Sequence, residues 1–92
     1  MPRMTAVLMH GERGGEGRYG FEVSEAVAAG PATGIMHAFM AHLDATADLG
    51  HIDYEINAAM KNRDLQITTV IGEMILPGGN RQPFACFIAP DA

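Results

Sequence analysis

The stretch "GEGRYGFEV", residues 15–23, decides between two fold classes. Its glycines fit the G-x-G-x-x-G spacing of a dinucleotide-binding loop, which requires a helix directly after the third glycine. Instead, apolar and polar residues alternate from Arg18 to Ser24, which predicts a half-buried strand over 18–24. Glu12 and Glu16 would also repel a phosphate. The stretch therefore indicates a glycine-rich hairpin loop over 10–17, preceded by a strand over 4–9, and no nucleotide cofactor.

The middle of the chain predicts one helix over 32–49. Its apolar residues recur at the spacing of one helical face: Ile35, Met36, Phe39, Met40 and Leu43. Gly50 suits the position just after a helix end. We expect Phe39 at the centre of the contact between this helix and the sheet, with Tyr19 and Phe21 packed under the helix.

The second half predicts three strands, over 52–60, 65–76 and 84–89, joined by turns at 61–64 and 77–80. Gly72 indicates a bulge in the second of these strands. In the first, the alternation predicts that five residues face the core: Ile52, Tyr54, Ile56, Ala58 and Met60. The element order ββαβββ predicts a single α+β domain over 1–92, with an antiparallel four- to five-stranded sheet and one helix packed on one face.

Composition excludes several function classes. The 92 residues are 48% apolar and 18% charged, as in one globular domain, and carry a net charge of −5. That charge argues against direct binding of nucleic acid and of anionic membranes. The single cysteine, Cys86, allows no intramolecular disulfide and no thiolate zinc cluster. No apolar run approaches the ~20 residues of a membrane span, so we expect a soluble, cytoplasmic protein.

Neither a metal site nor a nucleophile emerges from the spacing. The four histidines include no i, i+4 pair, and His37 shares a helix face with Asp44 and Asp48, which we interpret as a solvated surface. Cys86 lies in an apolar strand and is expected to be a buried, inert thiol. We therefore predict no metal, no cofactor and no catalytic side chain.

Pro2 supports an alternative prediction. If Met1 is removed, the amine of Pro2 becomes the N-terminus, and in an apolar pocket it could act as a general base. The opening "PRMTAVL", residues 2–8, resembles that of small tautomerases. In that family a helix follows the first strand directly, whereas a second strand is predicted here. The resemblance implies an isomerase, or a ligand-binding protein with its site at a subunit interface.

The distribution of charge favours a different function. Residues 19–60 contain six acidic residues and no Lys or Arg. Glu22, Asp53 and Glu55 occupy outward strand positions and would form one acidic face if their strands were neighbours, with Asp44 and Asp48 on the adjoining helix. Such a face attracts a basic partner. The sequence thus predicts a small acidic protein-interaction module, an inhibitor or adaptor, similar in size and charge to phage inhibitors such as anti-CRISPR proteins.

The C-terminal strands predict self-association. One helix is about 10 Å wide, whereas five strands span roughly 24 Å, so the helix covers only part of one sheet face. The segment 84–89 is nevertheless apolar on both faces. We therefore expect a homodimer, or a complex with a stable partner, formed through the C-terminal strands.

Overall fold

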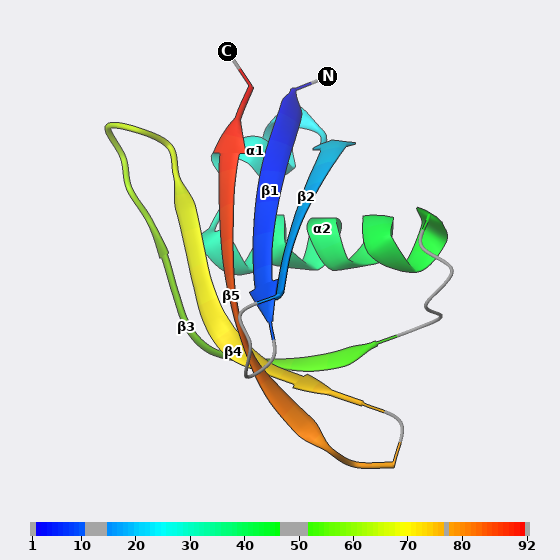
Figure 1. The fold of residues 1–92 in the computed structure, drawn as a ribbon. Helices are drawn as coiled ribbons and strands as arrows, with labels where there is room; N and C mark the ends of the chain where they lie inside the picture. The colour runs from blue at the N-terminus through cyan, green and yellow to red at the C-terminus, as the bar shows by residue number, and fades with distance from the viewer. Residues whose placement is uncertain (1, 11–14, 47–51, 77, 92) are drawn as a thin grey trace.

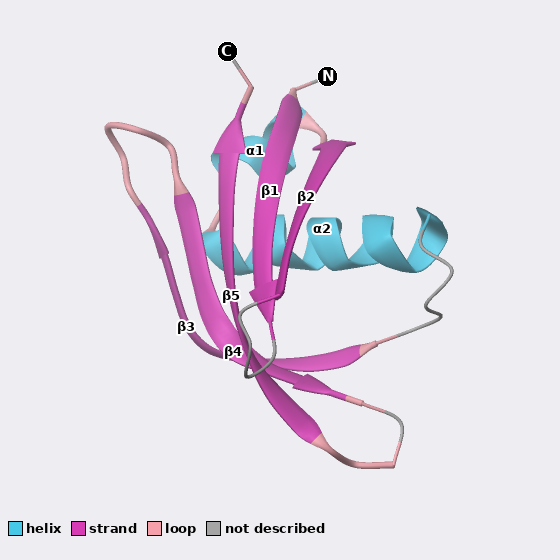
Figure 2. Cartoon of the chain, viewed as in Figure 1, coloured by secondary structure: helices cyan, strands magenta, loops and turns pink. Residues whose placement is uncertain are grey.

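Five antiparallel strands form one sheet, and two helices lie on the same side of it (Figure 1, Figure 2). The structure is a computed structural model that describes residues 2–10, 15–46, 52–76 and 78–91. The strand order across the sheet is β2-β1-β5-β4-β3. In chain order the elements are β1 (Arg3–His10), β2 (Gly15–Glu22), α1 (Glu25–Ala29), α2 (Ala32–Thr46), β3 (Asp53–Lys61), β4 (Thr68–Ile75) and β5 (Arg81–Pro90). The predicted α+β class and antiparallel sheet are confirmed.

The connection between β2 and α2 contains one short helix that the sequence pattern did not indicate. Ser24 begins α1 as its N-cap, because its hydroxyl accepts a hydrogen bond from the backbone N–H of Val27 at 3.2 Å. Pro31 precedes α2, and its carbonyl accepts from the N–H groups of Gly34 and Ile35. The described part of α2 ends at Thr46, and residues 47–49 of the predicted helix lie outside the described residues.

The core lies between α2 and the covered face of the sheet. Phe39 is fully buried, and its ring centroid lies 5.3 Å from that of Phe21 and 5.7 Å from that of Tyr19. The other four residues of the predicted helix face, Ile35, Met36, Met40 and Leu43, are also buried. Figure 1 shows α2 running across the strands, so one helix contacts residues from several of them. The predicted central position of Phe39 is confirmed.

A bulge in β3 changes which side chains of that strand face the core. The register between β3 and β4 shifts between Ile56 and Ala58, directly where β3 faces Gly72. Before the bulge Tyr54 and Ile56 pack against the core, as predicted. After it, Met60 pairs with Thr69 on the uncovered face and is 69% exposed. The predicted inward position of Met60 is therefore wrong, as is that of Ala58, because the extra residue reverses the alternation.

Strand bounds differ from the predicted ones where turns were expected. β2 already begins at Gly15, inside the predicted loop 10–17, and β5 begins at Arg81 rather than at Phe84. β4 begins only at Thr68, because Asn62 accepts hydrogen bonds from two backbone N–H groups in the turn before it. β1 and β5 lie side by side, so the start of β1 lies beside the end of β5 (Figure 1). Among the residues that the structure describes, no helix is long and apolar enough to cross a membrane.

Candidate interaction surface

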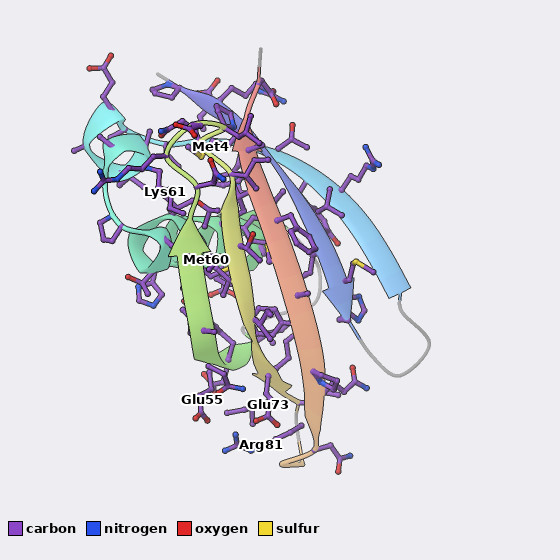
Figure 3. The ribbon with its side chains drawn as sticks, turned by 90° about the vertical axis from the view of Figure 1, so that its left-hand side faces the viewer. Met4, Glu55, Met60, Lys61, Glu73 and Arg81 are labelled. Carbon is purple, nitrogen blue, oxygen red and sulfur yellow. The ribbon has the colours of Figure 1, made fainter. Side chains whose placement is uncertain are left out.

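Three carboxylates gather at one end of the uncovered sheet face. Glu55 of β3 lies directly opposite Glu73 of β4, and Asp53 lies one row further along β3. We call Asp53, Glu55 and Glu73 the acidic end. Arg81 of β5 lies beside it, with its Nη1 2.8 Å from Glu55 Oε2 and 3.9 Å from Glu73 Oε1. Figure 3 shows Glu55, Glu73 and Arg81 together at the end of the sheet distant from Met4.

The acidic end keeps a negative charge despite Arg81. The hydrogen bond from Arg81 to Glu55, followed by the charges of Glu55 and Glu73, raises the pKa of the guanidinium further above its ordinary value. Arg81 thus pairs with two carboxylates, Glu55 and Glu73, which leaves one negative charge in excess among these three side chains. All of these side chains are at least partly exposed, so water screens the pairs, and each contributes little to folding stability.

The other predicted partner-binding residues lie apart from one another. Because β2 and β3 form opposite edges of the sheet, Glu22 cannot continue the row of Asp53 and Glu55, although all three face the same side. Glu22 lies 4.0 Å from Arg3 instead. Asp44 is exposed on α2 near β3, where burial and then the Asp44 charge raise the pKa of Tyr54. Asp48 lies outside the described residues.

Glu73 is the member of the acidic end that the sequence analysis missed. Its signal is weak but present, since it is the single charged residue within the apolar run "VIGEMIL", residues 70–76. Val70 and Met74 are buried beneath the helix, which places Glu73 on the uncovered face by alternation. Its relation to Glu55 and Arg81 follows only from the register of three strands.

An apolar belt crosses the same uncovered face between the acidic end and the edge where β1 begins and β5 ends. It consists of two neighbouring rows, each running across β1, β5, β4 and β3. One row holds Val7, Phe87, Thr69 and Met60, and the other holds Met9, Ala85, Ile71 and Ala58. The large side chains of the belt are exposed, from 40% for Met9 and Phe87 to 52% for Ile71 and 69% for Met60. A contiguous exposed apolar surface of this kind is typical of an interaction site.

A hollow of about 120 Å³ lies within the belt, where β3 and β4 pair. It is lined by Ala58, Ala59, Met60, Thr69 and Ile71. Its lining is mostly apolar, and a space of this size accepts the end of an aliphatic side chain.

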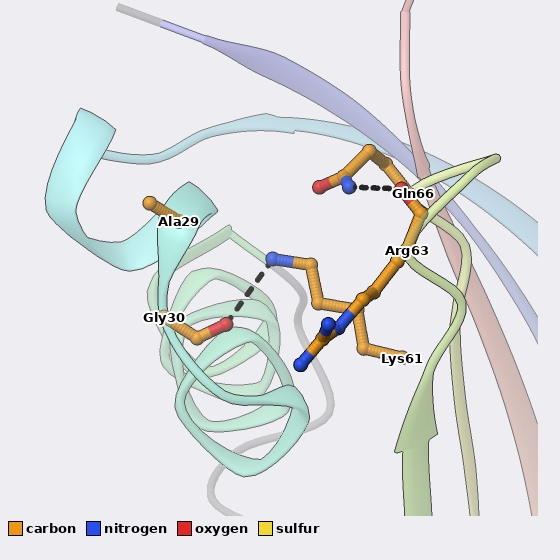
Figure 4. A pocket seen from close by; sticks show the side chains of 5 residues that line it. All are labelled: Ala29, Gly30, Lys61, Arg63 and Gln66. Carbon is orange, nitrogen blue, oxygen red and sulfur yellow. Dashed lines mark hydrogen bonds between the residues drawn. The ribbon is translucent and has the colours of Figure 1, made fainter.

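A second depression, of about 370 Å³, lies beside α1 on the helix side of the sheet (Figure 4). Lys61 at the end of β3 faces inward there, and its Nζ donates to the carbonyls of Ala28 at 2.7 Å and Gly30 at 3.2 Å. Arg63 and Gln66 complete the lining, and Gln66 donates to the carbonyl of Arg63. Lys61 was predicted in a turn, but it caps the carbonyl end of α1, so we assign this depression a structural role.

The remaining candidates carry no visible chemistry in the described part of the chain. Cys86 is fully buried, and burial raises the pKa of its thiol to about 12, as expected of an inert residue. No group of three or more potential metal-binding side chains occurs among the described residues. His37 is exposed, with its ring 5.9 Å from that of Tyr54. Pro2 lies at the start of β1, where its carbonyl accepts from the N–H of Val23, and its role as a base stays a prediction.

No protein-family model, curated protein or solved structure matches this chain.

Proposed function

We propose that this chain is a small non-enzymatic interaction module that binds a basic surface of a protein partner through the acidic end. The observation that supports this proposal is the direct opposition of Glu55 and Glu73 across two paired strands. Like charges in facing positions destabilise an antiparallel pair, and Arg81 offsets only part of that repulsion. Folding stability does not account for this arrangement, whereas recognition of cations does.

Electrostatic steering is the contribution we expect from this surface. Rim carboxylates add little affinity individually, but a concentrated negative potential accelerates encounter with a basic partner and disfavours acidic competitors. Asp44 extends the negative charge around the β3 edge onto α2, and the net charge of −5 extends it over the molecule. We expect Asp48 and Glu22 to contribute to this longer-range field.

The same surface suits an inhibitor of a protein that normally holds nucleic acid. A cluster of carboxylates can occupy a groove of Lys and Arg that otherwise binds phosphates. A phage or mobile-element inhibitor is one concrete form of such an acidic competitor. The single cysteine fits a reducing, cytoplasmic location.

A charge-neutralisation experiment tests the proposal. Affinity capture from the native host, eluted with salt, supplies the partner, and association rates are then measured by surface plasmon resonance. We expect Glu55→Gln with Glu73→Gln to slow association about tenfold at low salt and to flatten its salt dependence. The matched control, Glu25→Gln with Asp64→Asn, changes the net charge equally at exposed positions away from the acidic end. Equal association rates for the two double variants would show that only net charge matters and would refute the proposed docking surface.

A further inference from the structure

Large and small side chains alternate across the apolar belt in both directions. Along one row, small and large residues follow each other as Val7, Phe87, Thr69 and Met60. In the neighbouring row the order is reversed, with Met9, Ala85, Ile71 and Ala58. Each large side chain therefore has small neighbours within its row and across the rows. A surface of alternating knobs and holes is what interdigitating layers require.

This pattern is complementary to itself under a two-fold rotation. The axis lies between two facing sheets, runs across the strands and passes midway between the two rows. A rotation about this axis places each row of one copy over the other row of the second copy. Phe87 then lies over Ala85 of the second copy, and Ile71 lies over Thr69 of that copy. Met60 and Met9 likewise lie over Ala58 and Val7. A two-fold interface of this kind uses the same patch on both subunits.

The hollow in the belt matches this arrangement. Its lining includes the small side chains of Ala58 and Thr69 and the larger ones of Met60 and Ile71, and we take the small pair as its floor. The rotation directs Met60 and Ile71 of the second copy toward this floor. Because facing sheets are turned by about 30°, the pairs near the centre of the belt fit better than those at its edges.

Charge at the two ends of β5 favours this axis over the alternative, although within each copy Asp91 also contacts Arg3 and Arg81 also contacts Glu55. The rotation across the strands brings Asp91, just after β5, over Arg81 of the second copy at the start of β5. A two-fold axis parallel to the strands and midway between β5 and β4 also pairs large with small side chains. That axis would place Arg81 over Ile75, an apolar residue of β4.

From the alternation, the hollow and the charges, we infer that a second copy of this chain covers the apolar belt, related by a two-fold axis that runs across the strands.

This proposal is independent of the function assigned to the acidic end, and sedimentation equilibrium of the full chain tests it. The wild-type protein sediments as a dimer at micromolar concentrations. Ala85→Phe fills the hole that receives Phe87, so it weakens dimerisation about tenfold or more although it adds apolar surface. The matched control, Ala85→Ser, adds only a hydroxyl group and leaves the dissociation constant within about threefold. Circular dichroism establishes that each variant is folded.

A rescue variant identifies the axis. Ala85→Phe combined with Phe87→Ala exchanges a knob and a hole, and the rotation across the strands again places large over small, so dimerisation returns. With the parallel axis, the aromatic ring introduced at position 85 would meet Ile71, and dimerisation would stay impaired. If the double variant fails to dimerise, the proposed axis is wrong. If the single variant Ala85→Phe associates more tightly than the wild type, the side chains do not interdigitate and the apolar surfaces adhere nonspecifically. A monomeric wild-type protein, including one whose belt binds a different protein, overturns the dimer.

Discussion

Replacing Gly72 with alanine should destabilise the protein far more than the addition of one methyl group suggests. A Cβ atom at Gly72 would lie 2.0 Å from the carbonyl oxygen of Glu55 and 3.0 Å from Cε1 of Phe84. Real Cβ contacts essentially never fall below 3.0 Å, so the β3 backbone must retreat by about 1 Å (from 2.0 to 3.0 Å). The nearest obstacle is backbone, and no side-chain rotation can relieve it.

The displacement of β3 determines how much the free energy of unfolding falls. Moving β3 by about 1 Å stretches its hydrogen bonds to β4 beyond their working range, and losing two of them costs about 1–3 kcal/mol. Crowding of the buried Phe84 ring adds about 1–3 kcal/mol. We therefore expect Gly72→Ala to lower the free energy of unfolding by about 2–6 kcal/mol, a large share of the ~5–15 kcal/mol of an ordinary domain.

Gly34 provides the matched control, because the same change there has the opposite sign. A Cβ at Gly34 in α2 would meet only the Pro31 ring, at 3.9 Å. Alanine is the better helix former by about 0.5–1 kcal/mol, so Gly34→Ala should stabilise the protein by up to that amount. Urea unfolding measures both variants. If Gly72→Ala proved as stable as the wild type, β3 and β4 could not be paired in the register described.

Three further outcomes follow from the core and from α1. Phe39→Ala should lower the free energy of unfolding by about 3–5 kcal/mol in urea, and a loss below about 1 kcal/mol would contradict its central position. Lys61→Met should cost about 1.5–3 kcal/mol in the same assay, because the carbonyls of Ala28 and Gly30 lose a charged donor, and a neutral effect would show that water replaces it. Cys86 should react with a thiol reagent only after unfolding. Its pKa is raised from 9.0 to about 12, so stability should fall as pH rises through that interval, because only the unfolded thiol ionises there; rapid labelling of the native protein would contradict its burial.

Local patterns predicted the elements whose periodicity is unambiguous. Tyr19, Phe21 and Val23 alternate without interruption, and the apolar face of α2 repeats at helical spacing, so both were assigned correctly. Strand order was not predictable in this way. β1 pairs with β5 across about the whole length of the chain, and nothing local to Met4 or Ile88 specifies that pairing. Consequently the sequence could predict which face of the sheet a carboxylate lies on, but not which carboxylates lie close together.

The bulge in β3 shows why a face can be misassigned. In "INAAM", residues 56–60, two adjacent alanines make either alternation acceptable, since each turns one small residue toward the helices and the other away from them. The partner strand decides, because Gly72 allows the β3 backbone to approach closely at the residues before the shift. Gly72 was correctly linked to a bulge, but the extra residue lies in β3. Met60 is thereby moved from the predicted core to the apolar belt.

The proposed dimer axis determines where the two acidic ends would lie in the assembly. An axis across the strands reverses the strand direction of the second copy, so the two acidic ends lie at opposite ends of the assembly, separated by roughly the 26 Å length of eight strand residues or more. A partner with a single basic surface would bind each end independently, with the stoichiometry of one partner per chain. A partner with two basic surfaces at a matching spacing would gain affinity through the second, intramolecular contact. If both proposals hold, Ala85→Phe, which acts on the belt alone, should reduce binding of a two-site partner and leave binding of a one-site partner unchanged.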